Sequence, residues 1–164
     1  MPAPDQTVRP GTSGEFLAAG SAPPSSLPAG QAARQIGRWA EDQACQEALA
    51  RGWRVLDRNW RCRWGELDLV VWDGSQLVLV EVKCRRGSQR WGGAAAAVDR
   101  RKQQRLIRLA RAYLQEQARR HNLDPARVSV RFDVYLVEAA DQTVGTAGVN
   151  VVGRWLAGAF YSVS

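Results

Sequence analysis

Two carboxylates and one ammonium group could act together in this chain, those of Asp68, Glu81 and Lys83. Asp68 belongs to a first run of apolar and β-branched residues, and the other two belong to a second run. The turn residues Asp73–Gln76 separate the runs, which is the pattern of an antiparallel hairpin. A loop of these four residues places Asp68 directly opposite Glu81, with about 5 Å between their Cβ atoms.

Like charges that face each other across a sheet repel, so this arrangement needs compensation. A divalent cation would supply it, because Mg²⁺ prefers oxygen ligands and commonly takes one or two carboxylates together with water and substrate phosphate. The alternative is a surface ion pair between Glu81 and Lys83, of small energetic value, where the strand leaves the core. The hairpin by itself leaves both interpretations open.

The same register fixes which side chains share a face of the hairpin. Trp72 pairs with Leu77 at the loop, and alternation places Asp68 on one face with Glu66 and Val70. The opposite face of the first strand then carries Leu67, Leu69 and Val71. The second strand is predicted to be buried on both faces over residues 77–82.

The spacing of apolar residues predicts a helix over residues 31–51, with Ile36, Ala40 and Ala44 on its buried stripe. Glu41 lies about 100° around the helix from Ala40, so it borders the buried face. An ordinary solvated glutamate is the alternative for this position.

A longer helix is predicted over residues 99–122, with Asp99 as its N-cap. Its core face carries Leu106, Ala110, Tyr113 and Leu114. Another face repeats arginines at positions 101, 105 and 108. A basic face with few acidic neighbours suits a polyanion, and a solvated arginine face is the alternative.

The remaining elements are two strands and a C-terminal segment. Strands are predicted over residues 53–61 and 128–137, and a short helix is expected around Trp155 and Phe160. Four tryptophans crowd the first three strands. Aromatic residues at strand spacing are typical of sheet packing, so we assign this role to Trp53, Trp60, Trp64 and Trp72.

A basic, glycine-rich connector over residues 84–93 follows the strand that holds Glu81 and Lys83. Its composition predicts a mobile loop beside the proposed site. Arg85 and Arg86 could bind a phosphate backbone there through their guanidinium groups, and a solvated loop is the alternative.

Composition divides the chain at residue 33. Residues 1–33 are rich in Pro, Ala, Gly and Ser, which predicts a disordered tail without a secretory signal, and residues 34–164 have the length of a single domain. The chain carries a formal charge of +7, which favours nucleic acid as a partner. It has no apolar run long enough to cross a membrane. Three widely spaced cysteines indicate reduced thiols in the cytoplasm, and one histidine argues against histidine-based catalysis.

Five segments in order resemble the YraN family of predicted bacterial nucleases. They are 37–41 with Gly and Glu at its ends, 58–61 (RNWR), 65–68 (GELD), 80–83 (VEVK) and 131–133 (RFD). The same Asp and Glu-x-Lys residues resemble the signature of the PD-(D/E)xK superfamily, whose fold is restriction-endonuclease-like. The resemblance implies an α/β fold in the order αβββαβ, with a central mixed four-stranded sheet flanked by helices.

The resemblance also implies roles for individual residues. Asp68, Glu81 and Lys83 would be catalytic, and Mg²⁺ or Mn²⁺ would be held by Asp68, Glu81, the backbone carbonyl of Val82 and Glu41. Lys102 matches a lysine of the family pattern. Nucleic acid would be bound by Arg85, Arg86, Lys102 and Arg105.

The sequence therefore predicts a metal-dependent endonuclease acting on nucleic acid, with DNA favoured over RNA and the choice between them left open. A non-catalytic nucleic-acid-binding module and a structural protein with an acidic ion-pair network are the alternatives. A junction-like substrate favours a homodimer, and the sequence leaves the oligomeric state open.

Overall fold

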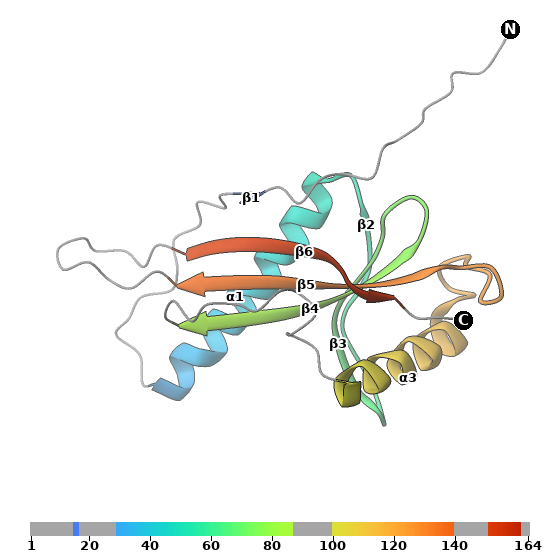
Figure 1. Ribbon diagram of the computed structural model, residues 1–164, viewed down its shortest axis with the longest axis horizontal. Helices are drawn as coiled ribbons and strands as arrows, with labels where there is room; N and C mark the ends of the chain where they lie inside the picture. Colours follow the sequence, from blue (N-terminus) through green and yellow to red (C-terminus); the bar gives the residue numbers. More distant parts are fainter. Residues whose placement is uncertain (1–14, 17–28, 87–99, 140–150, 162–164) are drawn as a thin grey trace, which may run out of the picture.

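A computed structural model describes residues 15–16, 29–86, 100–139 and 151–161 of the chain. Its centre is a mixed sheet in the order β1-β6-β5-β4-β3-β2 (Figure 1). The strands are β1 (Glu15–Phe16), β2 (Arg54–Cys62), β3 (Gly65–Trp72), β4 (Leu77–Arg86), β5 (Val130–Ala139) and β6 (Val151–Tyr161). The helices are α1 (Ala29–Ala50) and α3 (Arg100–Gln117).

The order of the elements confirms the predicted αβββαβ core. Strands β2, β3 and β4 form an antiparallel meander, and β5 joins β4 in parallel after a connection that contains α3. The predicted number of four strands is wrong, because the sheet has five long strands and the two-residue β1. The extra long strand is β6, which pairs antiparallel with β5 where a short helix was expected.

Strand β1 lies within the segment that the composition assigns to a disordered tail. Glu15 pairs with Arg154 and Phe16 pairs with Gly153 at the edge of the sheet. Helix α1 begins at Ala29, two residues earlier than the prediction. Most of residues 1–28, and the expected N-cap Asp99, lie outside the described residues, so disorder of the tail stays a prediction. None of the helices in the described part of the chain is long and apolar enough to cross a membrane.

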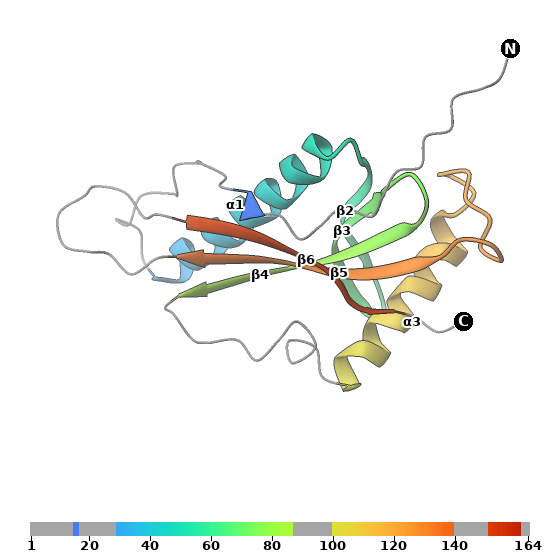
Figure 2. The same cartoon turned by 45° about the horizontal axis from the view of Figure 1, so that its top comes forward.

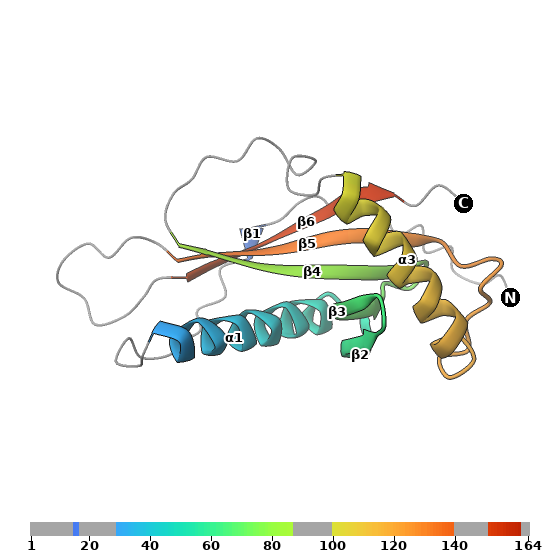
Figure 3. The same cartoon turned by 90° about the horizontal axis from the view of Figure 1, so that it is seen from below.

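The two helices cover opposite faces of the sheet (Figures 2 and 3). On β4, Val78 and Val80 pack in the core on the α1 side, while Leu77 and Leu79 pack in the core on the α3 side. Both alternate sets are fully or almost fully buried, which confirms β4 as a central strand.

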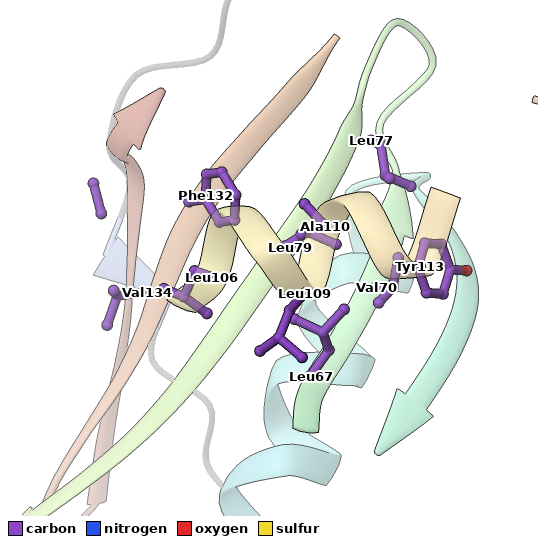
Figure 4. Packing of buried hydrophobic residues seen from close by; sticks show 11 residues of the cluster. Leu67, Val70, Leu77, Leu79, Leu106, Leu109, Ala110, Tyr113, Phe132 and Val134 are labelled. Carbon is purple, nitrogen blue, oxygen red and sulfur yellow. The ribbon is translucent and has the colours of Figure 1, made fainter. Parts of the chain in front are cut away.

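Helix α3 closes one core with an apolar stripe (Figure 4). Leu106, Ala110 and Tyr113 are buried there as predicted, and Leu109 joins them. They meet side chains from three strands, Leu67, Val70, Leu77, Leu79, Phe132 and Val134. Burial of this stripe fixes the rotation of α3 about its axis, so its basic side faces away from the core.

The hairpin departs from the predicted alternation at one point. Leu67 packs with Val70 on the α3 side, whereas Leu69 and Val71 pack on the α1 side. The predicted grouping of Leu67 with the latter two is therefore wrong. The break lies beside Asn59 on the neighbouring strand, whose φ of 51° is left-handed and interrupts the regular strand conformation.

Candidate active site and basic groove

The candidate site lies where β3 and β4 come together at the end of their paired region. The predicted register is confirmed from Trp72 and Leu77 at the loop to Leu69 and Val80. Asp68 and Glu81 are the next residues along each strand. The backbone N–H of Val82 donates a hydrogen bond of 2.8 Å to Oδ2 of Asp68, which holds the carboxylate against β4.

The Asp68 carboxyl lies in an environment that disfavours its charge. Burial raises its pKa to about 6, and the negative charges of Glu81 and Glu41 act in the same direction. The hydrogen bond from Val82 and the charge of Lys83 oppose this shift without cancelling it. The charged form of Asp68 is therefore poorly compensated, and two other carboxylates are near enough to disfavour it.

Glu81 has the opposite environment. Lys83 Nζ lies 2.5 Å and Lys102 Nζ lies 2.8 Å from its Oε1. Although burial alone would raise the pKa of Glu81, the hydrogen bonds and charges of Lys102 and Lys83 hold it below its usual value. Two neighbouring carboxyl groups thus have pKa values pushed apart, a feature that is common where acid–base or metal chemistry occurs.

Glu41 approaches this site from α1. Its negative charge adds to the effect of burial in raising the pKa values of Asp68 and Cys84. Its Oε2 accepts a hydrogen bond of 3.0 Å from Nδ2 of Asn59. Asn59 is a residue to which the sequence analysis gives no role, although it belongs to the family-like segment 58–61. Asparagine tolerates a left-handed backbone better than most residues, which is the signal that could have identified it.

A basic groove begins at the same site and follows α3. Its volume is about 670 Å³, and it is lined by Trp64, Arg101, Lys102, Gln104, Arg105 and Arg108. Lys102 is shared between the groove and the Glu81 ion pair. The predicted packing role is wrong for Trp64, which is 44% exposed, whereas Trp53 and Trp60 pack edge-on against Trp155 and Tyr113.

The predicted site residues are thus only partly gathered. Asp68, Glu81, Val82, Lys83 and Lys102 lie together, as the contacts above show. Glu41 is close enough to act on Asp68, and Arg105 lies farther along the groove. Arg85 and Arg86 end β4, and their side chains, like the rest of the basic connector, lie outside the described residues.

The oxygen atoms at the candidate site suit a metal ion that needs few protein ligands. Within the described ranges, no group of three or more His, Cys, Asp and Glu side chains could hold a metal ion. The oxygens of Asp68, Glu81 and the Val82 carbonyl nevertheless suit Mg²⁺ or Mn²⁺, which accept few protein ligands and complete their shell with water and phosphate. Such an ion would compensate the charge of the Asp68 carboxylate, which the Val82 hydrogen bond and Lys83 compensate only in part.

The single histidine lies away from these carboxylates. His121 Nε2 is 2.8 Å from Oδ2 of Asp57, which also accepts a hydrogen bond of 2.6 Å from the Tyr113 hydroxyl. These contacts tie the end of α3 to β2. The histidine therefore has a structural contact at this end of the helix.

Comparison with known proteins places the chain among bacterial relatives. A family model described as "Uncharacterised protein family UPF0102" matches residues 40–137. A UPF0102 protein of Pseudomonas paraeruginosa is 47% identical over 108 residues, which are 66% of this chain and 82% of that protein. One from Frankia casuarinae is 52% identical over 102 residues, 62% of this chain and 80% of that protein. One from Pseudomonas fluorescens is 41% identical over 126 residues, 77% of this chain and 93% of that protein.

Proposed function

The chain belongs to the uncharacterised protein family UPF0102, which is the YraN family, and from its site we propose that it is a metal-dependent endonuclease. The reaction is hydrolysis of phosphodiester bonds, in DNA rather than RNA, with Mg²⁺ or Mn²⁺ as cofactor. The name of the family states no activity, so the proposal rests on the residues of the site.

One observation supports the proposal above the others. Burial and the charge of Glu81 raise the pKa of Asp68, whereas Lys102 and Lys83, both in contact with Glu81, hold the pKa of Glu81 below its usual value. A structural ion-pair network has no need of the additional, poorly compensated carboxylate of Asp68. A site that receives a cation together with a phosphate does need it.

Each residue has a definite task in this proposal. Asp68, Glu81 and the Val82 carbonyl would hold the cation, and Glu41 would assist directly or through water. A metal ion held there would lower the pKa of a coordinated water and stabilise charge on the phosphoryl group. Lys83, a compact ammonium, would orient the attacking water or neutralise the phosphate. Lys102 and Arg105 would hold the backbone of the nucleic acid, with Arg85 and Arg86 as further donors.

A second candidate is a nucleic-acid-binding module without catalysis. The observation that favours it is the pair of lysines on Glu81, because they already compensate the carboxylate that the cation would share. This candidate requires binding that is indifferent to Mg²⁺ and falls steeply with salt.

Cleavage assays on the purified full-length protein distinguish the two candidates. Labelled duplex, nicked, branched and single-stranded DNA and RNA are incubated with Mg²⁺, Mn²⁺ or EDTA. We expect metal-dependent cleavage that falls by about 100-fold or more in Asp68→Asn and in Lys83→Ala. Glu116→Gln, an exposed acid-to-amide change on α3, is the matched control. Full cleavage by either site variant would refute the assignment, and binding without cleavage on every substrate would favour the second candidate.

A further inference from the structure

We propose that the basic groove along α3 binds an unpaired segment of nucleic acid, with one base stacked on Trp64 and the backbone held by the arginines of α3. The inference rests on the proposed function, since it names the substrate form that the same site receives. It assigns Trp64 to ligand binding, and it makes single-stranded or locally unpaired nucleic acid the ligand.

The exposure of Trp64 is the first observation. The residue stands in the tight turn between β2 and β3, and 44% of its surface is exposed, whereas Trp155 in the core is 1% exposed. The guanidinium of Arg63 lies 4.6 Å from the centroid of the indole ring. One exposed aromatic residue is ordinary on a protein surface, so its meaning depends on what surrounds it.

The surroundings are a channel of positive charge. Trp64 lines the groove with Arg101, Lys102, Arg105 and Arg108, and no acidic residue lines it among the described residues. The ion pairs found in the described part of the chain include none of the three arginines. A phosphate backbone supplies the charge that this lining lacks.

Gly65 lets the side chain of Arg105 lie close to the turn that holds Trp64. A Cβ atom on Gly65 would lie 2.7 Å from Nη2 of Arg105, and the φ of Gly65 is +135°. Only glycine permits both the backbone conformation and this close approach. The guanidinium therefore lies directly beside the residue that follows Trp64.

The groove leads to the proposed catalytic carboxylates. Lys102 lines it and at the same time contacts Oε1 of Glu81 at 2.8 Å. A strand bound along the groove, with one base on Trp64 and its backbone on Arg105 and Lys102, would therefore have Glu81 beside the lysine that it contacts. Lys102 thus joins the groove that Trp64 lines to the proposed catalytic carboxylate.

The combination of indole and guanidinium groups selects the form of the ligand. Phosphate contacts by arginines serve duplex and single strand alike, because both carry the same charged backbone. An indole ring can stack only on a base whose face is open, and the bases of an intact duplex are stacked on each other. Trp64 therefore contributes affinity for unpaired nucleotides and little for duplex.

Binding measurements on the full-length protein in EDTA test this without requiring cleavage. Fluorescence anisotropy with a labelled single-stranded oligonucleotide and with the duplex of the same sequence gives two dissociation constants for each variant. We expect Trp64→Ala to weaken single-strand binding about 5- to 100-fold and duplex binding less than 2-fold. Trp64→Phe should recover most of the loss, since phenylalanine retains a ring.

Two further variants separate stacking from other effects. Leu49→Ala removes another large exposed apolar side chain, on α1 and outside the groove, and should leave both dissociation constants unchanged. Arg105→Ala should weaken both ligands and reduce the slope of log K against log salt by about 0.7 for the single strand.

The outcomes also separate this inference from the proposed function. If Trp64→Ala binds single strand as tightly as the wild type, or loses duplex affinity equally, the inference is wrong even when the protein cleaves DNA. Selective single-strand loss in a protein that never cleaves would support the inference and refute the nuclease. Thermal unfolding of Trp64→Phe and Trp64→Ala checks that neither loss comes from misfolding.

Discussion

Lys102 Nζ lies 2.8 Å from Oε1 of Glu81, so the first turn of α3 is connected by charge to the middle of β4. Glu81 is mostly buried, with 19% of its side chain exposed, and it shares its two cations between a strand and a helix. The charge compensation of the Glu81 carboxylate therefore depends on the position of α3.

Removal of Lys102 should cost stability that a metal ion restores. Lys102→Ala leaves a mostly buried carboxylate with one cation instead of two, so we expect the free energy of unfolding in EDTA to fall by about 1–2 kcal/mol. Saturating Mg²⁺ should return most of this loss, because the ion binds Glu81 more tightly once the competing charge of Lys102 is removed. Urea unfolding at several Mg²⁺ concentrations measures both effects.

Arg111→Ala, which removes an exposed cation of the same helix outside the groove, is the control and should show neither effect. A loss in Lys102→Ala that is identical in EDTA and in Mg²⁺ would argue against a cation at Glu81.

Neutralisation of Asp68 should stabilise the protein when no metal is present. The charged carboxylate is buried near Glu81 and Glu41, which is unfavourable, and the amide of Asp68→Asn still accepts the hydrogen bond from Val82. We expect the unfolding free energy in EDTA to rise by about 1–2 kcal/mol. The midpoint of thermal unfolding should then no longer respond to Mg²⁺ or Mn²⁺, whereas the wild-type midpoint rises. A variant that is less stable than the wild type in EDTA would contradict this reading of the site.

Asn59 has separable roles in the backbone and in the site. Asn59→Ala places a side chain that disfavours φ of 51° there, and it should lower the unfolding free energy by about 1 kcal/mol. Asn59→Gly should be close to neutral in stability, since glycine accepts this conformation. Both variants lose the hydrogen bond to Glu41, so both should reduce metal-dependent cleavage to a similar degree. Equal stability of the two variants, by urea unfolding, would show that the φ value carries no strain.

Asp73 should make the protein sensitive to acid. Burial alone would raise the pKa of its carboxyl, but hydrogen bonds from the N–H groups of Ser75 and Gln76, from the Ser75 hydroxyl and the charge of Arg131 lower it below the usual 3.8. A lowered folded-state pKa stabilises the protein above pH 3.8, and this contribution is lost as the pH falls through the folded-state value. Asp73→Asn should therefore be less stable than the wild type near neutral pH, and the difference should shrink below about pH 4. Urea unfolding from pH 3 to pH 7 tests this, and a constant difference would exclude the linkage.

The hairpin and the neighbouring carboxylates were predictable because they depend on local pattern. A loop at Asp73–Gln76 fixes the register as far as Leu69 and Val80, and Asp68 and Glu81 are the next residues along the two strands. The outward position of Trp64 was not predictable in this way, because alternation is interrupted in β3 and the tight turn has its own geometry. The hydrogen bond from Asn59 to Glu41 likewise joins residues that lie far apart in the sequence, so a local pattern does not predict it.

Strand β6 was misread for a related reason. Its apolar residues do not alternate strictly, since the register with β5 shifts between Phe132 and Val134 and Gly158 has a φ of +65°. The buried carboxylate of Asp133 accepts hydrogen bonds of 2.8 Å from both the Gly158 N–H and the Trp155 indole N–H. These contacts across the sheet stabilise an irregular strand whose sequence has no strand periodicity.

Helix α3 contributes Leu106 to the core one residue after Arg105 in the groove and one turn after Lys102 at Glu81. Because a helix moves as a unit, a smaller side chain at Leu106 that lets α3 settle toward the sheet also shifts both cations. A genetic screen for loss of function in this protein should therefore recover conservative changes in its interior alongside changes of charged residues. Some of those alleles should regain activity through second-site substitutions that refill the interior and leave the ligand-contacting residues as they are.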